Sequence, residues 1–222
     1  IERVYNSGTI RGDIILGMGG DEVRNSGLIE GSIDLGADAD LYDGRNGELR
    51  GVVFAGAHDD RLLGGASADV FFGEDGADAI FGGDGDDYID GGRGSDALDG
   101  GEGFDTVSYL SAGLGVVVDL SADLAIAGDS IDILSGFEDV QGSLFADRIT
   151  GSGDDNVLDG AAGDDVIAGG EGDDVILGGA GVDILTGGGG DDTFVFSTGD
   201  GHDVVADFKP GSTADRISVF GY

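Results

Sequence analysis

Apolar residues recur at a nine-residue interval in two stretches of this 222-residue chain. They run from Leu62 to Val107 in the first stretch and from Ile149 to Phe194 in the second. The positions between them are dominated by Gly and Asp, which favour turns. The pattern predicts many short strands, each centred on one apolar residue and separated from the next by a tight turn. Its fixed period indicates a repeat architecture.

Each repeat can be written out with almost no slippage. Residues 55–108 read as AGAHDDRLL, GGASADVFF, GEDGADAIF, GGDGDDYID, GGRGSDALD and GGEGFDTVS. Residues 142–195 read as GSLFADRIT, GSGDDNVLD, GAAGDDVIA, GGEGDDVIL, GGAGVDILT and GGGGDDTFV. Every unit carries Asp at its sixth position, except for Asn156, and an apolar residue at its eighth. A disordered Gly/Asp linker would also be acidic, but it has no reason to keep an apolar residue two places after each Asp.

This G-G-x-G-x-D-x-U-x pattern, in which U is apolar, resembles the repeat of the RTX family of secreted bacterial proteins. The resemblance implies an all-β fold, a right-handed parallel β-roll or β-solenoid, in which each unit supplies a six-residue turn and a three-residue strand. Two units then complete one coil, and parallel strands of successive coils pair. The eighth-position residues are expected to stack as the core, and each Asp is expected to lie above the Asp two units earlier.

The resemblance also implies calcium as the cofactor, with one ion between each unit and the second unit after it. Ca²⁺ accepts carboxylate and carbonyl oxygens in flexible geometry, so about eight ions are expected in the two regular arrays. The expected side-chain ligands are Asp60, Asp69, Asp78, Asp87, Asp96, Asp105, Asp147, Asn156, Asp165, Asp174, Asp183 and Asp192. The turn glycines expected to surround the ions are Gly65, Gly76, Gly83, Gly85, Gly92, Gly94, Gly101, Gly103, Gly163, Gly170, Gly172, Gly179, Gly181, Gly188 and Gly190.

Two places in the second array depart from the pattern. Asn156 keeps a side-chain oxygen but lacks the charge, and Phe145 replaces the usual glycine at position four. The ions that pair Asp147 with Asp165 and Asn156 with Asp174 are therefore expected to be weaker than the others.

Residues 1–54 carry a looser repeat of 19 to 20 residues, in which Asn6-Ser7-Gly8 recurs as Asn25-Ser26-Gly27. Asp21, Asp40 and Asp60 follow the same spacing, which predicts that acidic turns continue along one side of an N-terminal solenoid extension. Calcium between Asp21 and Asp40 and between Asp40 and Asp60 is one interpretation, and a calcium-free cap is the other.

Residues 109–141 interrupt the repeat. Gly115–Leu120 and Leu124–Ala127 have the composition of strands, and we expect enlarged coils there; a linker between two independent β-rolls is the alternative. Residues 196–222, with Asp203–Gly211 and Asp215–Ile217, resemble the strand-turn-strand that follows RTX arrays and covers the open end of the roll. Family members often continue beyond such a segment, so a truncated C-terminal cap is expected.

Composition agrees with a metal-dependent fold. The chain has 48 Gly, 46 acidic and 10 basic residues, and its net charge is −36. Such a charge opposes a compact state unless cations neutralise it, which predicts that calcium binding and folding are coupled. Nucleic acid is not expected as a partner, because phosphate binding requires clustered Lys and Arg. The absence of Cys excludes disulfides and thiolate metal sites, and no apolar run is long enough to span a membrane.

Catalytic motifs are missing from the sequence. The two histidines, His58 and His202, do not form an H-E-x-x-H motif, and neither G-x-S-x-G nor a P-loop occurs. His58 is interpreted as a turn residue and His202 as part of the C-terminal segment. Paired acids such as Asp86 and Asp87 invite comparison with glycosidases, but the calcium interpretation accounts for all of them at once. The chain is therefore not expected to be an enzyme.

Aromatic residues offer a second interpretation of the surface. Phe71, Phe72, Phe81 and Tyr88 are either strand filler or a carbohydrate-binding patch. The function expected from the resemblance is that of a calcium-binding module of a secreted bacterial protein, extracellular or on the cell surface, which leaves unfolded through a type I exporter and folds in external calcium. The alternatives are an accessory module of an exported protease, lipase or polysaccharide-modifying enzyme, and an adhesin or surface-layer segment that contacts carbohydrate or cells.

Overall fold

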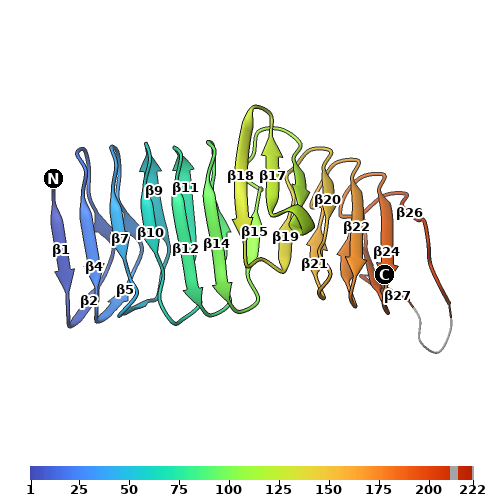
Figure 1. Cartoon of the computed structure of the whole chain (residues 1–222), viewed down its shortest axis with the longest axis horizontal. Helices are drawn as coiled ribbons and strands as arrows, with labels where there is room; N and C mark the ends of the chain where they lie inside the picture. The colour runs from blue at the N-terminus through green and yellow to red at the C-terminus, as the bar shows by residue number, and fades with distance from the viewer. Residues whose placement is uncertain (211–214, 222) are drawn as a thin grey trace. The chain divides into compact units, whose positions relative to one another are not determined.

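The computed structural model describes residues 1–210 and 215–221, and its regular structure is β-strand apart from one 3₁₀ turn, η1 (Leu120–Ala122). The strands form two compact units. Unit 1 comprises Ile1–Val107 and Ser130–Phe137, and unit 2 comprises Ser108–Asp129 and the chain from Glu138 onward. Each unit is a β-solenoid of parallel strands (Figure 1), which confirms the predicted fold class.

Unit 1 has three parallel sheets. Sheet 1 contains, in spatial order, β1 (Arg3–Asn6), β4 (Glu22–Asn25), β7 (Leu41–Asp43), β10 (Arg61–Leu63), β12 (Ala79–Asp84), β14 (Ala97–Glu102) and β18 (Ser130–Ser135). Sheet 2 contains β3 (Ile14–Ile15), β6 (Ile33–Asp34), β9 (Val53–Ala57), β11 (Val70–Asp75), β13 (Tyr88–Asp90) and β15 (Thr106–Ser108). Sheet 3 is short and contains β2 (Thr9–Arg11), β5 (Leu28–Glu30) and β8 (Glu48–Leu49).

Unit 2 has two sheets. Sheet 4 contains β17 (Leu124–Ala127), β16 (Val117–Asp119), β20 (Arg148–Thr150), β22 (Val166–Glu171), β24 (Ile184–Gly189) and β26 (Val204–Val205). Sheet 5 contains β19 (Asp139–Gln141), β21 (Val157–Asp159), β23 (Val175–Leu177), β25 (Thr193–Ser197) and β27 (Arg216–Phe220). β16 and β17 pair in antiparallel fashion, whereas the other pairings of these sheets are parallel.

The core consists of the eighth-position residues, stacked one above another. Leu62 of β10 pairs with Ile80 of β12, which in turn pairs with Leu98 of β14. Leu62 and Ile80 are fully buried and Leu98 is 2% exposed. The register places identical repeat positions side by side, because successive strands of one sheet are two repeats apart. A one-residue slip in register would move the apolar residues from the interior to the surface.

The N-terminal coils differ from the regular ones because each has a third strand. Ile29 of β5 and Leu49 of β8 are buried beneath sheet 3. At the start of the same coils, the side chains of Asn6 and Asn25 are joined by a 2.8 Å hydrogen bond. The longer repeat of residues 1–54 therefore corresponds to a three-sided coil rather than to a two-sided one.

The interrupting segment contains the two strands predicted there, as β16 and β17. Residues 130–137 belong to unit 1, in which Ile133–Ser135 of β18 pair with β14. In the C-terminal segment, β26 and β27 extend sheets 4 and 5 in parallel, and Gly211 of the predicted turn lies outside the described residues. Within the described ranges, no helix has the length and apolar character that a membrane span requires.

Candidate metal centre

The sixth-position aspartates form columns in which consecutive members are hydrogen-bonded. The backbone N–H of each donates to Oδ1 of the Asp in the next coil, as in Asp69 to Asp87 (2.7 Å) and Asp78 to Asp96 (2.9 Å). We call these residues the ladder residues. In unit 1 the columns are Asp21, Asp40, Asp60, Asp78, Asp96 and Asp132, and Asp69, Asp87 and Asp105. In unit 2 they are Asp147, Asp165, Asp183 and Asp203, and Asn156, Asp174, Asp192 and Asp215.

The local sequence explains this geometry. In the two regular arrays, each ladder residue directly precedes a strand, and the residue two places later is buried in the core. Because the strands are parallel and in register, the residue before each strand lies beside its counterpart in the next coil. All the predicted ligand pairs are therefore adjacent, including Asp21 with Asp40 (2.5 Å) and Asp40 with Asp60 (2.7 Å), measured from the amide nitrogen to Oδ1.

The second carboxylate oxygen of most ladder residues is buried and accepts no hydrogen bond. This applies to Oδ2 of Asp40, Asp60, Asp78, Asp87, Asp96, Asp165, Asp174, Asp183 and Asp192. Buried polar atoms in proteins are nearly always hydrogen-bonded, and an unpaired buried charge is strongly unfavourable. These oxygens are therefore positioned for a ligand that brings positive charge.

Burial also makes these carboxylates poor acids. Loss of solvation raises the pKa of Asp60, Asp78, Asp87, Asp96 and Asp165 to about 7. The neighbouring ladder carboxylate adds to the effect, whereas the hydrogen bond from the previous ladder N–H opposes it. A cation bound at the column would lower the pKa of these carboxylates, because it favours their ionised form.

The first-position glycines complete each cradle. A Cβ on Gly82 would overlap both Asp87 Oδ2 and the carbonyl oxygen of Gly100, the first-position glycine two units later. The same pair of oxygens surrounds Gly160, where the overlap would be with Asp165 Oδ2 and the Gly178 carbonyl. A carboxylate oxygen and a carbonyl oxygen thus converge at a place kept open only because no side chain fills it.

The predicted turn glycines line the same columns, and most of them have positive φ. Gly94 shows a second reason for glycine at these positions, because a Cβ there would overlap the carbonyl oxygen of Gly76. Positive φ occurs at Gly83, Gly85, Gly92, Gly94, Gly101, Gly103, Gly163, Gly170, Gly172, Gly179, Gly181, Gly188 and Gly190. Gly65 and Gly76 have φ values outside this region.

The donor set fits calcium. Within residues 1–210 and 215–221, no three His, Cys, Asp or Glu side chains converge on one point, so a metal held here must take several ligands from backbone carbonyls. Calcium accepts such a mixture of oxygens, in about six- to eightfold coordination. The ladder carboxylates and the glycine carbonyls would hold the ion, and the ion would neutralise the column.

The two ladder residues at which weak calcium binding was expected, Asp147 and Asn156, are hydrogen-bonded to other groups of the protein. Oδ2 of Asp147 accepts a 2.6 Å hydrogen bond from the Ser143 N–H. The Asn156 side chain accepts from the Ser152 N–H (2.7 Å) and donates to the Glu138 carbonyl (2.8 Å). An amide N–H₂ group facing this carbonyl presents hydrogen atoms where the other coils present a carboxylate oxygen.

Sequence reasoning missed three ladder residues outside the regular arrays, namely Asp132, Asp203 and Asp215. Each accepts the N–H of the preceding ladder residue, from Asp96 (3.0 Å), Asp183 (3.0 Å) and Asp192 (3.4 Å) respectively. The available signal was the Asp-x-apolar triplet, as in Asp132-Ile133-Leu134. It was hidden because the spacing from the previous ladder residue is 36, 20 or 23 residues instead of 18.

The remaining candidate residues do not assemble into one site. His58 is exposed in a turn, with Nδ1 2.7 Å from the Ala57 carbonyl oxygen, and has φ of 86°. His202 is exposed in the C-terminal segment of unit 2.

The four aromatic residues considered for carbohydrate binding are divided by the fold. Phe71 is fully buried in the core. Phe81 lies on sheet 1, where the Arg61 guanidinium carbon lies over its ring, 5.0 Å from the ring centroid. Phe72 and Tyr88 lie on sheet 2, where the Phe72 ring stacks on Phe54 with centroids 5.3 Å apart. Because Phe71 is buried and Phe81 lies on a different sheet from Phe72 and Tyr88, the four residues do not share one surface, and carbohydrate binding stays a prediction.

Parallel coils with columns of buried carboxylates define a metal-binding repeat solenoid. The model of the RTX calcium-binding nonapeptide repeat matches this chain in overlapping segments that span residues 54–107 and 132–205. This is more than half of the chain, and the chain belongs to the RTX family. Such repeats typically form a non-catalytic module, and the match indicates no catalytic family. A comparison with curated proteins found no match.

Solved structures with a similar fold include two bacterial proteins. The extracellular lipase LipA from Serratia marcescens is 21% identical, with a TM-score of 0.31, and the match covers 74% of this chain and 33% of the lipase. A hyperactive, Ca²⁺-dependent, β-helical antifreeze protein from an Antarctic bacterium is 22% identical, with a TM-score of 0.43, covering 88% of this chain and 64% of that protein. The chain thus spans about a third of the lipase and less than two thirds of the antifreeze protein.

Proposed function

We propose that this chain is a calcium-responsive module that is unfolded at low calcium and forms its β-solenoid units when calcium binds to the ladder residues whose buried Oδ2 has no donor. The observation that supports the proposal is the set of buried Oδ2 atoms without a donor. A fold that buries many such oxygens is unfavourable until a cation neutralises them. The free energy of metal binding then becomes free energy of folding.

Within each coil, the two carboxylate oxygens and the glycines have different roles. Oδ1 of a ladder residue such as Asp78 accepts a hydrogen bond from the Asp60 N–H and holds two coils in register. Oδ2 of the same residue is free to bind the metal. The first-position glycine leaves room beside it and the glycine carbonyls contribute further oxygens, while the bound ion supplies the compensating charge.

We further propose that the module is part of a longer bacterial protein that passes through a type I exporter in the unfolded state and folds outside the cell. The net charge of −36 supports this order of events, because it disfavours premature folding where calcium is scarce. Calcium sites of extracellular modules bind at about 10⁻⁴–10⁻³ M, which separates cytosolic from external calcium levels. The proposed location is extracellular or on the cell surface.

Far-UV circular dichroism of the 222-residue chain during a calcium titration tests the proposal, with a parallel magnesium titration. A cooperative coil-to-β transition with calcium and none with magnesium is the expected result, because Mg²⁺ requires a smaller, near-octahedral site. A complete β spectrum in excess chelator would contradict calcium-dependent folding. The exporter is tested separately, by expressing the parent protein with and without a type I system and measuring its appearance in the medium.

A further inference from the structure

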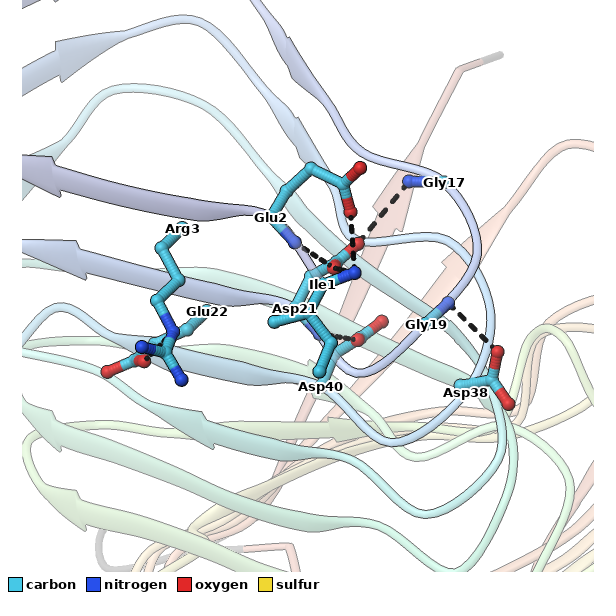
Figure 2. Close-up of polar contacts among 9 residues, drawn as sticks. All are labelled: Ile1, Glu2, Arg3, Gly17, Gly19, Asp21, Glu22, Asp38 and Asp40. Carbon is cyan, nitrogen blue, oxygen red and sulfur yellow. Dashed lines mark hydrogen bonds and ion pairs between the residues drawn. The ribbon is translucent and has the colours of Figure 1, made fainter.

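Thirteen of the ladder residues fall into two groups according to the residue four positions earlier, four in one group and nine in the other. In four of them, the N–H of that residue donates to the ladder side chain. Figure 2 shows the first case, in which Gly17 N lies 3.5 Å from Asp21 Oδ2. The others are Gly65 to Asp69 (3.0 Å), Ser143 to Asp147 (2.6 Å) and Ser152 to Asn156 (2.7 Å). We call Asp21, Asp69, Asp147 and Asn156 the closed ladder residues.

The second group has no such bond. Its members are the ladder residues whose buried Oδ2 accepts no hydrogen bond, and we call them open. They are Asp40, Asp60, Asp78, Asp87, Asp96, Asp165, Asp174, Asp183 and Asp192.

Backbone conformation separates the two groups without exception. Four positions before each open residue, φ is positive, as at Gly36 (103°), Gly56 (107°), Glu74 (70°), Gly83 (116°), Gly92 (86°), Ala161 (65°), Gly170 (125°), Gly179 (84°) and Gly188 (105°). Four positions before each closed residue, at Gly17, Gly65, Ser143 and Ser152, φ lies outside that region. Since φ sets the direction of a residue's own N–H, positive φ turns this donor away from the carboxylate.

The residue type does not determine which conformation is adopted. Gly17 and Gly65 are glycines, which adopt positive φ readily, yet they keep the N–H on the ladder residue. Glu74 and Ala161 are L-residues, for which the left-handed region is sterically unfavourable, yet they adopt it. Such outliers persist only where the surrounding structure imposes them, and they cluster at binding sites.

The position of a ladder residue in its column does separate the closed residues from the open ones. Each closed residue is the first Asp or Asn of its column within its unit, and each open residue has a ladder residue before it. Each column therefore begins on a carboxylate or carboxamide that accepts a hydrogen bond from the protein's own N–H, and the open residues come later in the same columns.

We propose that tight calcium sites form only where the first ladder residue of a pair is open. An N–H directed at the second oxygen occupies its lone pair and presents positive charge toward the position of the cation, so a closed residue excludes the ion. The proposal rests on the proposed calcium function. Of the predicted pairs, it assigns ions to Asp40–Asp60, Asp60–Asp78, Asp78–Asp96, Asp87–Asp105, Asp165–Asp183 and Asp174–Asp192, and none to the pairs that begin with Asp21, Asp69, Asp147 or Asn156.

Two matched variants of the full chain test this, with native mass spectrometry in calcium to count bound ions and circular dichroism to record the titration midpoint. Asp69→Asn keeps an oxygen for the Gly65 N–H, so the ion count and midpoint are expected to match those of the wild type. Asp78→Asn replaces an open oxygen by an amide and is expected to lose at least one ion and to need severalfold more calcium. Equal losses in both variants would overturn the inference.

Restoring the charge at a closed position provides the second test, which remains decisive if Asp78→Asn does not fold. Asn156→Asp alone is expected to add no ion, because Ser152 still donates to the side chain. The double variant with Ser152→Gly is likewise expected to add no ion, because Gly65, a glycine at the equivalent place before the first ladder residue of its column, still donates to Asp69. An added ion in Asn156→Asp alone would also overturn the inference. A wild-type chain that binds no calcium would instead refute the proposed function.

Discussion

The backbone N–H of Asp69 donates a 2.7 Å hydrogen bond to Oδ1 of Asp87, and Oδ2 of Asp87 is buried without a donor. One carboxylate thus has two separate roles, because one oxygen aligns consecutive coils and the other remains for the metal. The stability of the coil and the binding of calcium therefore depend on the same side chain.

Replacement of Asp87 by Ala is expected to destabilise the calcium-loaded chain. It removes a metal ligand and also leaves the buried Asp69 N–H without its acceptor, which alone costs about 1–3 kcal/mol. Urea denaturation at saturating calcium measures the change. Asp84→Ala is the matched control, since Asp84 is an exposed acid in the same nonapeptide unit, and it is expected to remain within about 0.5 kcal/mol of the wild type. An equal loss of stability in the two variants would show that the ladder residue contributes no more to stability than an exposed acid does.

A methyl group on Gly82 is expected to block the cradle. It would overlap Asp87 Oδ2 and the Gly100 carbonyl, and overpacking of this kind costs about 1–3 kcal/mol besides the loss of the ion. Gly153→Ala is the control, because nothing lies within 4 Å of its Cβ position and its φ is not in the left-handed region. Thermal unfolding in calcium compares them; a Gly82→Ala chain as stable as Gly153→Ala would argue against the cradle.

Mild acid is expected to replace calcium in part. Burial raises the pKa of Asp60, Asp78 and Asp87 in the folded chain to about 7, compared with about 3.9 when unfolded. The folded state therefore binds more protons, and its stability relative to the unfolded state is greatest below the unfolded pKa and is lost as the pH rises through 7. In chelator, the β signal in circular dichroism should grow as the pH falls from about 7 to about 4. A signal that is flat or declines over this range would contradict the prediction.

The three-sided N-terminal coils are expected to hold more residual structure than the two-sided coils when calcium is removed. They bury Ile29 and Leu49 beneath a third sheet, and ion pairs such as Arg11 with Glu30 (2.8 Å) link their surface strands. Hydrogen exchange of the full chain in chelator, read by mass spectrometry, should show slower exchange in residues 22–49 than in residues 70–107. Equally fast exchange in both segments would mean that these coils also require the metal.

The core and most of the columns could be predicted from sequence because both are set by local spacing. An Asp two places before an apolar residue, repeated every nine residues, places the Asp at the start of a strand and the apolar residue inside the coil. Parallel pairing then brings Asp60, Asp78 and Asp96 together, as the ladder hydrogen bonds require. The same spacing argument missed Asp132, because the non-repetitive segment that contains β16, η1 and β17 lies between it and the first array and carries no nine-residue period.

The sequence by itself determined the nine-residue period and, through the resemblance to the RTX repeat, the β-solenoid class, the stacked core and which carboxylates are neighbours, because a fixed period brings equivalent positions of successive coils side by side. Only the tertiary structure decided which carboxylates remain open. Gly65 and Gly83 occupy the same repeat position, yet the N–H of one caps Asp69 and positive φ turns the other away from Asp87. A glycine permits both conformations at little cost, so the choice is made by the coils packed against it.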